Sequence, residues 1–402
     1  MRETFTPRRR TVSAVAAMVS AAAIGCGTVL PAEAAPAAGR VLYEDSPDAV
    51  DGRYIVTLKN SVGFKANSRK GGQLAAKYGA TVWKTYGSVL NGYAVRVGAA
   101  GARSFAADPA VASVEQDQKV HLDATQFNPL WGLDRIDQFR LPLSRSYTYP
   151  DSAGRGATVY VIDTGVRITH TQIAGRAAYG YDAIDGDTIA SDGNGHGTHV
   201  ATTVAGATYG VAKAARIVAV RVLDADGSGT TSGVIAGVDW VTSHRTGPAV
   251  ANMSLGGSAS TALDTAVRNS IASGVTYAVA AGNDNRNAVY SSPARVSSAL
   301  TVGASTSTDF RAGFSNYGYL LDLFAPGASI TGGWHTSDTA AATLSGTSMA
   351  APHVAGAAAV YLTTHPTAGP AAVHSALVSG ATIGVLRNIG SGSPNRLLRV
   401  VP

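Results

Sequence analysis

Apolar and polar positions follow two different patterns along this chain of 402 residues. Between residues 50 and 122 the apolar runs are short. An alternation with a period of two predicts strands at GRYIVTLKN and GYAVRV, and QLAAKYGA has helical spacing. The segment ARSFAADPAVASVEQDQKV predicts a further helix and strand. We therefore expect a small α+β domain here.

From about residue 155 near-continuous apolar runs alternate with helical segments. Strands are predicted at GATVYVIDTGV, ARIVAVRVL, PAVANMSLG, VTYAVAAGN and ALTVGAS, and helices at HVATTVAGA, VIAGVDWVTSH and ALDTAVRNSIASG. This alternation indicates an α/β domain of three layers, with a mostly parallel sheet between helices. The stretch HLDATQFNPLWGLDRI, which joins the two domains, lacks strong periodicity and is interpreted as a connector.

Residues 1–34 have the pattern of a secretory signal peptide. Three arginines at 8–10 precede an apolar run over 12–30, and Ala32 and Ala34 fit a small-residue cleavage site. Gly and Ser interrupt the run, which disfavours a membrane helix. Two further features stay open: a loose twin-arginine match, and Cys26 in an imperfect lipid-attachment context. We predict a secreted, extracellular protein with no membrane association after maturation.

Composition narrows the class of protein. The chain is 45% hydrophobic and 14% charged, which is typical of globular proteins. Its net charge is +6, but basic and acidic residues are nearly balanced over 124–402 and form no basic cluster there, so nucleic acid is not a predicted partner. Cys26 is the only cysteine. The exported chain therefore has no disulfide, and its stability depends on core burial, with bound metal as a further source.

Four polar residues stand where chemistry concentrates in parallel sheets, beyond the carboxyl ends of strands. Asp163 ends one predicted strand and Asn283 follows another. His196 lies between two glycines where a loop meets a helix, and Ser348 precedes a run of small helix-forming residues. Each residue alone also has a plain structural interpretation: a turn residue for Asp163 and Asn283, and a helix N-cap for Ser348.

Two further details concern these positions. His196 and His199 are closer than the histidine pair of an HExxH zinc site, and no Glu lies between them, so a zinc site is not predicted. Pro352 is acceptable in the first turn of a helix, which places Ser348 at the N-terminal end of a buried helix. There the unpaired N–H groups and the helix dipole favour negative charge.

Five motifs in chain order (YVIDTGV, GHGTH, SLGG, AAGN and SGTSMAAPHVAG) resemble those of the subtilisin-like serine peptidases. The segments GVAKAARIVAVRVLDADGSGT, FSNYG and WGLDRID are similar to the proteinase K-like branch, near the aqualysin type. The stretch 50–122 resembles the inhibitor-type propeptide of that family. The resemblance implies a signal peptide over 1–34, a propeptide over 35–123 and a subtilisin-like peptidase domain over 124–402.

The resemblance also implies a role for each candidate residue. Ser348 would be the nucleophile, His196 the general base, Asp163 the group that orients the imidazole, and Asn283 a donor to the oxyanion. Two segments would pair with an extended peptide substrate: Gly227, Ser228 and Gly229 on one side, and Ser254, Leu255 and Gly256 on the other. Small residues in SLGG and AAGN imply an open apolar pocket, and hence cleavage of broad specificity after aromatic or large apolar residues.

Calcium is the cofactor that the resemblance implies. One site would use the Asp322 carboxylate with the backbone carbonyls of Ser297 and Ala299; another would use residues of WGLDRIDQ, namely Asp134, Asp137 and Gln138. For the second set a solvated acidic face remains the alternative. The family's site near the carboxyl end needs an Asp where Val385 stands, so we expect that site to be absent. No organic cofactor is expected.

These features predict a secreted serine endopeptidase of protein and peptide substrates. It would be a monomer made as a self-cleaving zymogen, with its own propeptide as an intramolecular inhibitor and a cut near Asp123–Ala124. The alternative is a catalytically silent binding protein with the subtilisin fold. A dinucleotide-binding oxidoreductase is excluded because no G-x-G-x-x-G follows the first strand of the large domain.

Overall fold

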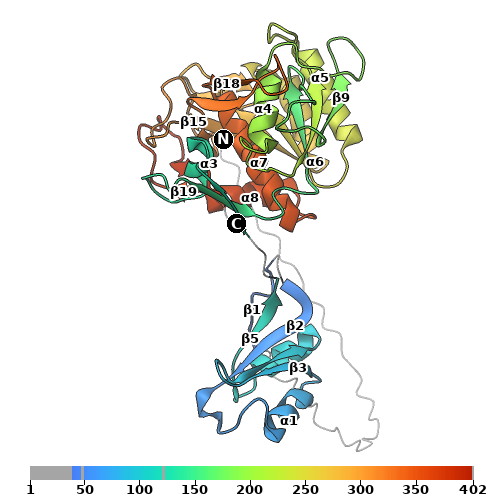
Figure 1. Cartoon of the computed structure of the whole chain (residues 1–402), viewed down its shortest axis with the longest axis vertical. Coiled ribbons are helices and arrows are strands. Elements are labelled where there is room, and N and C mark those ends of the chain that lie inside the picture. Colours follow the sequence, from blue (N-terminus) through green and yellow to red (C-terminus); the bar gives the residue numbers. More distant parts are fainter. Residues whose placement is uncertain (1–38, 47–48, 120–122, 401–402) are drawn as a thin grey trace, which may run out of the picture. The chain divides into compact units, whose positions relative to one another are not determined.

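The computed structural model describes residues 39–46, 49–119 and 123–400, which form two compact units (Figure 1). Of the described residues, the smaller unit contains 39–44 and 50–117, and the larger unit contains those between 45 and 49 and from 118 onward. The residues of the predicted signal peptide lie outside the described residues.

The smaller unit is a sheet with helices against it. Its strands lie in the order β1-β5-β2-β4-β3, and β2 and β3 both pair with β4 antiparallel. The predicted strands and helices are present, but β1 and β3 were missed because β1 is very short and most side chains of β3 are exposed. The bounds are β1 Val41–Leu42, β2 Ala49–Leu58, α1 Arg69–Lys77, β3 Thr81–Tyr86, β4 Gly92–Arg96, α2 Ala99–Ala106 and β5 Val111–Gln118.

Burial in this unit follows the alternation seen in the sequence. Tyr54, Val56 and Leu58 of β2 point into its core, and their neighbours along the strand are less buried. They pack with Tyr93 of β4 and Phe105 of α2. The Tyr93 hydroxyl donates to the backbone carbonyl of Gly71 at 2.8 Å, so its polar atom is paired inside the core.

The larger unit is built on a sheet that, within the described residues, has nine strands in the order β19-β20-β16-β15-β13-β11-β8-β10-β9. Every neighbouring pair is parallel except β19 and β20. The bounds are β8 Thr158–Asp163, β9 Ala177–Asp182, β10 Arg216–Arg221, β11 Ala249–Met253, β13 Val275–Ala280, β15 Leu300–Ser305, β16 Leu323–Pro326, β19 Thr382–Ile383 and β20 Arg396–Leu397.

Helices cover both faces of this sheet, as predicted. In β8 the side chains of Val159 and Val161 enter one core, and those of Tyr160 and Ile162 enter the other. The first core includes α4 (His196–Ala205), α7 (Thr347–Thr364) and α8 (Pro370–Gly380), and the second includes α5 (Thr231–His244) and α6 (Thr261–Ala272). Because both faces of the sheet are buried, side chains on both sides of β8 are mostly apolar. The sequence of β8 therefore does not show the alternation of apolar and polar residues that marks a strand with one exposed face.

The interpretation of residues 121–136 as a connector is wrong in part. Asp123–Phe127 forms β6, which pairs antiparallel with β7 (Ser146–Pro150), and Trp131–Ile136 forms the short helix α3. A two-stranded ribbon and a helix of little more than one turn are too short to produce a clear period. The other described strands of this unit are β12 (Gly257–Ser258), β14 (Ser291–Ser292), β17 (Ile330–Gly333) and β18 (Ala341–Leu344), and a short 3-10 helix, η2, spans Ala288–Tyr290.

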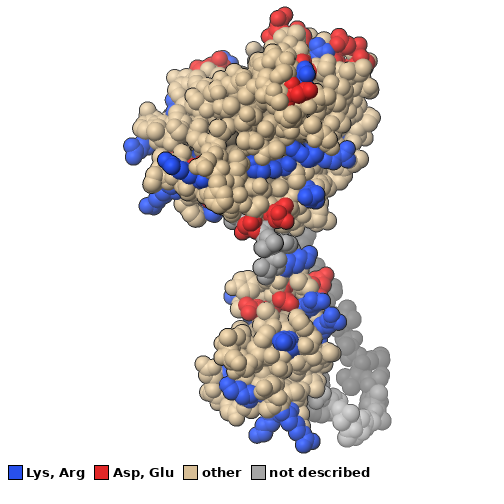
Figure 2. All heavy atoms as spheres, in the orientation of Figure 1, with Lys and Arg blue, Asp and Glu red and all other residues tan. Residues whose placement is uncertain are grey.

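Charge is sparse on the larger unit. On the face shown in Figure 2 most of its surface is uncharged, and basic and acidic side chains both occur in small groups. Within the described residues, no helix has the length and apolar content needed to cross a bilayer.

The helix α7 corrects the expectation about Pro352. The helix begins at Thr347, so Pro352 is its sixth residue and lies beyond the first turn. Pro352 has no N–H to offer the carbonyl of Ser348, four residues earlier. The hydroxyl of Ser254 donates to that carbonyl instead, at 2.7 Å. The helix thus tolerates the proline because Ser254, which directly follows β11, supplies the missing hydrogen bond.

Two histidines are buried between α4 and α7. The Nε2 atom of His199 lies 3.0 Å from the carbonyl oxygen of Ile330, and Nδ1 of His353 lies 2.8 Å from that of Met349. Burial is the main cause that lowers the pKa of each histidine to about 4; the charge of His196 contributes for His199, and the charge of His199 contributes for His353. The folded protein therefore holds both rings neutral at pH 7.

We predict that acid weakens the fold through this pair. The folded-state pKa of about 4 lies below the ordinary 6.5, so protons bind the unfolded chain more tightly. The free energy of unfolding should fall from pH 6.5 toward pH 4, by on the order of 3 kcal/mol per histidine. Calorimetry of Ser348→Ala, which prevents self-digestion, measures this. His353→Gln should flatten the pH slope and His244→Gln, at an exposed site, should not; equal slopes in both variants would contradict the assignment.

Candidate active site

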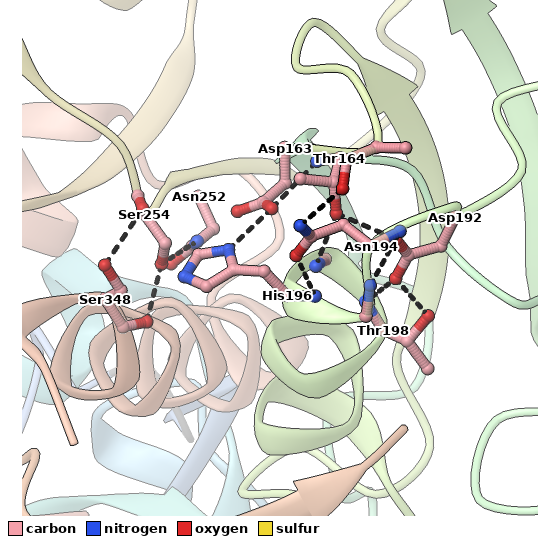
Figure 3. A network of polar contacts seen from close by, with 12 residues as sticks. Asp163, Thr164, Asp192, Asn194, His196, Thr198, Asn252, Ser254 and Ser348 are labelled. Atoms are coloured by element: carbon pink, nitrogen blue, oxygen red, sulfur yellow. Dashed lines mark hydrogen bonds and ion pairs between the residues drawn. The ribbon is translucent and has the colours of Figure 1, made fainter. Parts of the chain in front are cut away.

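Asp163 ends β8 with a fully buried carboxylate (Figure 3). Its Oδ1 atom accepts hydrogen bonds from the backbone N–H of Thr164 at 2.8 Å and from Nδ1 of His196 at 2.7 Å. Its Oδ2 atom is buried and has no hydrogen-bond partner among the described residues. A carboxylate in this position is costly to desolvate, so the imidazole is held close to it.

His196 is the first residue of α4, and the backbone before it requires glycine. Gly195 has φ of +113°, which other residues rarely adopt. A Cβ at Gly195 would also come within 2.5 Å of the side chains of Trp334 and His335. The sharp entry into α4 directs the His196 side chain toward Asp163, and 25% of that side chain stays exposed.

The loop that carries His196 is held by Asp192, a residue that the sequence analysis missed. Its Oδ1 accepts from the N–H groups of Asn194 and Gly195 and from the Thr164 hydroxyl, and its Oδ2 accepts from the N–H and hydroxyl of Thr198. An Asp shortly before a helix, followed by glycines, is a sequence signal for such a cap. Asp192 thus joins the end of β8 to the first turn of α4.

The charge of His196 is set by its two acidic neighbours. Burial lowers its pKa, but the charge and hydrogen bond of Asp163, together with the charge of Asp192, outweigh burial and raise the pKa above the ordinary 6.5. With Nδ1–H donating to Asp163, Nε2 of the neutral ring is left as the basic nitrogen. His196 can therefore accept a proton on the side away from Asp163.

Ser348 lies in the first turn of α7, as the sequence predicted. Its hydroxyl donates to the backbone carbonyl of Ser254 at 3.0 Å, and the described residues include no hydrogen bond between Ser348 and His196. Figure 3 shows the His196 ring between Asp163 and the pair Ser254–Ser348. His196 and Ser348 both line the same cleft.

Asn283 is oriented by Thr347. Its Oδ1 atom accepts from the N–H and from the hydroxyl of Thr347, both at 2.8 Å. Because an N–H group donates to it, this atom must be the amide oxygen, and Nδ2 is free to donate elsewhere. A Cβ built on Gly346 would lie 3.5 Å from Nδ2, which places the amide beside the residues that precede Ser348.

The two predicted substrate segments face one cleft of about 850 Å³. It is lined by all six of their residues: Gly227, Ser228, Gly229, Ser254, Leu255 and Gly256. A second hollow of about 290 Å³ continues from it and is lined by Leu255, Gly256, Gly282, Asn283 and Ser348 among others. The cleft can take an extended chain, and the hollow can take one side chain beside Ser348.

The structure brings Asp134, Asp137 and Gln138 together around the segment 144–148. Asp134 and Gln138 both accept from the N–H of Ser144, at 3.0 and 2.9 Å, and Asp137 accepts from the N–H of Thr148 at 2.7 Å. The other oxygen of Asp137 is buried without a hydrogen-bond partner. Burial, with the charge of Asp134, raises the pKa of Asp137. A cation fits this unpaired oxygen.

Asp322 lies near the loop that carries Ser297 and Ala299. One of its oxygens accepts from the N–H of Thr301 at 2.8 Å, and the other lies 3.0 Å from Nε2 of His374. A carboxylate with backbone carbonyls is a donor set that suits calcium. The described residues contain no group of three or more His, Cys, Asp or Glu side chains arranged for a metal, so any metal here would need backbone or amide oxygens in addition to the carboxylates.

Comparison with known proteins identifies the family. The model of the subtilase family matches residues 154–395, and that of peptidase inhibitor I9 matches residues 53–123. The chain belongs to the subtilase family. It is a serine endopeptidase domain with an inhibitor I9 domain before it, as the sequence motifs predicted.

Individual relatives agree with this assignment. The extracellular serine proteinase of Thermus sp. (strain Rt41A) is 54% identical over 372 residues, which cover 88% of this chain and 90% of that protein. The alkaline serine exoprotease A of Vibrio alginolyticus is 45% identical and covers 88% of this chain and 68% of that protein. The crystal structure of a cold adapted subtilisin-like serine proteinase matches with a TM-score of 0.67 and 53% identity, over 68% of this chain and 99% of that one.

We predict that Ser254→Ala loosens the first turn of α7 in this subtilase. The change removes the donor to the Ser348 carbonyl, which Pro352 leaves unpaired, and the acceptor of the Asn252 amide at 2.8 Å. An unpaired buried polar group costs about 1–3 kcal/mol. Denaturant unfolding should show that loss, and kcat/KM should fall with it. Ser258→Ala in the same cleft is the control, and an equal unfolding free energy for the two variants would rule out the role.

Proposed function

We propose that this protein is secreted as a zymogen that cuts itself and then hydrolyses peptide bonds through Asp163, His196 and Ser348. The observation that carries the proposal is the 2.7 Å bond from Nδ1 of His196 to the buried Asp163 carboxylate, in a cleft that Ser348 also lines. The inhibitor domain before the peptidase domain supports the zymogen, and the extracellular relative supports secretion.

The chemistry follows from the positions of the protons. Nε2 of His196 takes the Ser348 hydroxyl proton as Oγ attacks the substrate carbonyl, and later gives a proton to the leaving amine. The Asp163 carboxylate fixes the ring with Nδ1–H inward and stabilises the imidazolium. The Ser348 hydroxyl leaves its bond to the Ser254 carbonyl as the substrate enters. Catalytic hydrogen bonds often tighten only with substrate bound.

The oxyanion forms between two donors. The Nδ2 group of Asn283, whose oxygen is held by Thr347, is one, and the backbone N–H of Ser348 in the first turn of α7 is the other. The dipole of α7 adds positive potential at this end. Loss of one such donor typically costs about 10²–10³ in kcat.

The cleft supports an extended peptide as substrate. The backbone of the bound peptide pairs with the segments 227–229 and 254–256. The side chain of the peptide residue just before the cleaved bond enters the hollow beside Asn283. A hollow of about 290 Å³ has room for an aromatic or large apolar side chain. We propose broad specificity with a preference for such residues, and a monomer as the active form.

The first test is self-cleavage. Residues 35–402 and the same chain with Ser348→Ala are expressed and followed by gel and intact mass. The wild type should lose about ninety residues, a count that follows from a cut near Asp123. The variant should keep them because it lacks the nucleophile. If both stay full length while folded, a casein assay after a trace of active protease separates a silent binding protein from an enzyme matured by another protease.

Calcium is proposed at both candidate sites. Asp322 with the carbonyls of Ser297 and Ala299 would hold one ion, and the Asp134, Asp137 and Gln138 set would hold another. The ion would supply positive charge to oxygen ligands and no reaction step. The second site would tie α3 to the segment that leads into β7, in a chain that lacks disulfides after export.

We expect chelation to lower thermal stability. An ion at 100 times its Kd stabilises the folded state by about 2.7 kcal/mol. This stabilisation is measured by thermal unfolding of Ser348→Ala. EDTA should lower the melting temperature, and addition of Ca²⁺, but not of Mg²⁺, should restore it. Asp137→Asn and Asp322→Asn should each reduce the gain, whereas Asp239→Asn, at an exposed site, should not. A melting temperature unmoved by EDTA would refute both sites.

A further inference from the structure

One carboxylate stands on the wall of the substrate cleft without a counter-charge. Asp226 is exposed and lines the cleft together with His196 and Ser348. Among the described residues its backbone N–H donates to Asp224, but its carboxylate has no ion pair or hydrogen bond, and neither Lys nor Arg lines this cleft. In the adjoining hollow the one acidic side chain, Asp284, is paired with Arg286 at 3.2 Å. Asp226 is therefore the one unneutralised negative charge on these described walls.

The turn that carries Asp226 is rigid. Asp224 accepts hydrogen bonds from the N–H groups of Asp226 and Ser228, both at 2.9 Å, and its own N–H donates to the Ser228 carbonyl at 2.8 Å. Gly227 has φ of +77°, which lets the chain reverse there. The turn is thus closed by its own hydrogen bonds, and it carries the Asp226 carboxylate at its tip.

This turn is joined to the loop of the catalytic histidine. The Asn194 side chain donates to the Ala225 carbonyl at 2.8 Å, and its oxygen accepts from the N–H of His196 at 3.2 Å. Asp226 therefore stands at the end of the segment 224–229 that is nearest His196. The other end of that segment leads to Thr230 and Thr231, which line the part of the cleft that follows Gly229.

Position along the cleft determines which substrate residue meets Asp226. In the proposed function, on which this inference rests, the residue before the cut (P1) enters the hollow beside Asn283. The chain that precedes P1 then runs along 227–229, so the first residue before P1, which is P2, passes the end next to His196. A cationic side chain at P2 would meet the exposed carboxylate on the wall of the cleft, where opposite charges attract.

We propose that Asp226 makes this subtilase favour Lys or Arg at P2 of its substrates. The carboxylate acts as a specificity-determining group and takes no part in proton transfer. An exposed ion pair of about 0.2–1 kcal/mol corresponds to a preference of up to about five-fold in kcat/KM. The preference is electrostatic, so it weakens as salt screens the charge.

The test compares three peptides with Phe at P1 and Lys, norleucine or Glu at P2, and a fourth with Lys at P4 and norleucine at P2. For the mature wild type at low salt, kcat/KM should be about two- to five-fold higher for P2 Lys than for norleucine, and lowest for P2 Glu. Asp226→Asn should bring the Lys-to-norleucine ratio close to one. Asp239→Asn, which removes a charge from α5 outside the cleft, should keep the wild-type ratio. High salt should reduce the ratio only where Asp226 is present.

The outcomes separate this inference from the proposed function. Wild-type ratios near one at low salt, or ratios that Asp226→Asn leaves unchanged, overturn the role of Asp226 while cleavage itself stands. A change that Asp226→Asn causes for P4 Lys and not for P2 Lys overturns the assignment to P2. A folded, mature wild type that cleaves none of the four peptides contradicts the proposed function instead.

Discussion

The buried charge of Asp163 constrains the rest of the active site. A carboxylate with no exposed surface at the end of β8 must be compensated, and Thr164 and His196 provide that at 2.8 and 2.7 Å. The imidazole reaches it only because Gly195 turns the chain sharply into α4. The loop before α4 is in turn fixed by Asp192. The buried Asp163 oxygen thus fixes the orientation and tautomer of the His196 ring, while Gly195 and Asp192 fix the backbone that carries it.

The second half of the site depends on a helix that runs through the core. Nearly all of α7 is buried, and its first turn opens at the cleft, so Ser348 combines a rigid base with an accessible hydroxyl. The proline in this helix leaves the Ser348 carbonyl without its usual donor, and Ser254 replaces it. The same short segment thereby holds the first turn of α7 and lines the cleft.

Much of this architecture was predictable because each strand, and each candidate residue of the site, is marked by a pattern within a few neighbouring residues of the sequence. The strands of the large sheet are continuous apolar runs, and the residues at Asp163, His196, Asn283 and Ser348 follow from their places after strands and at helix starts. The strand β3 was missed because most of its side chains are exposed, β9 because four of its six residues are only partly buried, and α3 because it is short. Asp192 has a capping signal in the sequence, but the five donors that it gathers appear only in the structure. Asp226 needed coordinates, because it is defined by its lack of a partner across the described cleft.

The position of β8 in the sheet has a consequence for timing. Its neighbours β10 and β11 lie later in the chain, and Ser348 follows all the parallel strands from β8 to β16. An incompletely synthesised chain therefore lacks Ser348 and the strands that hold Asp163 in place. Such topologies, rich in contacts between distant segments, also fold slowly. The order of segments thus delays assembly of the cleft: Asp163, His196 and Ser348 come together only after α7 has been made and has packed on the sheet.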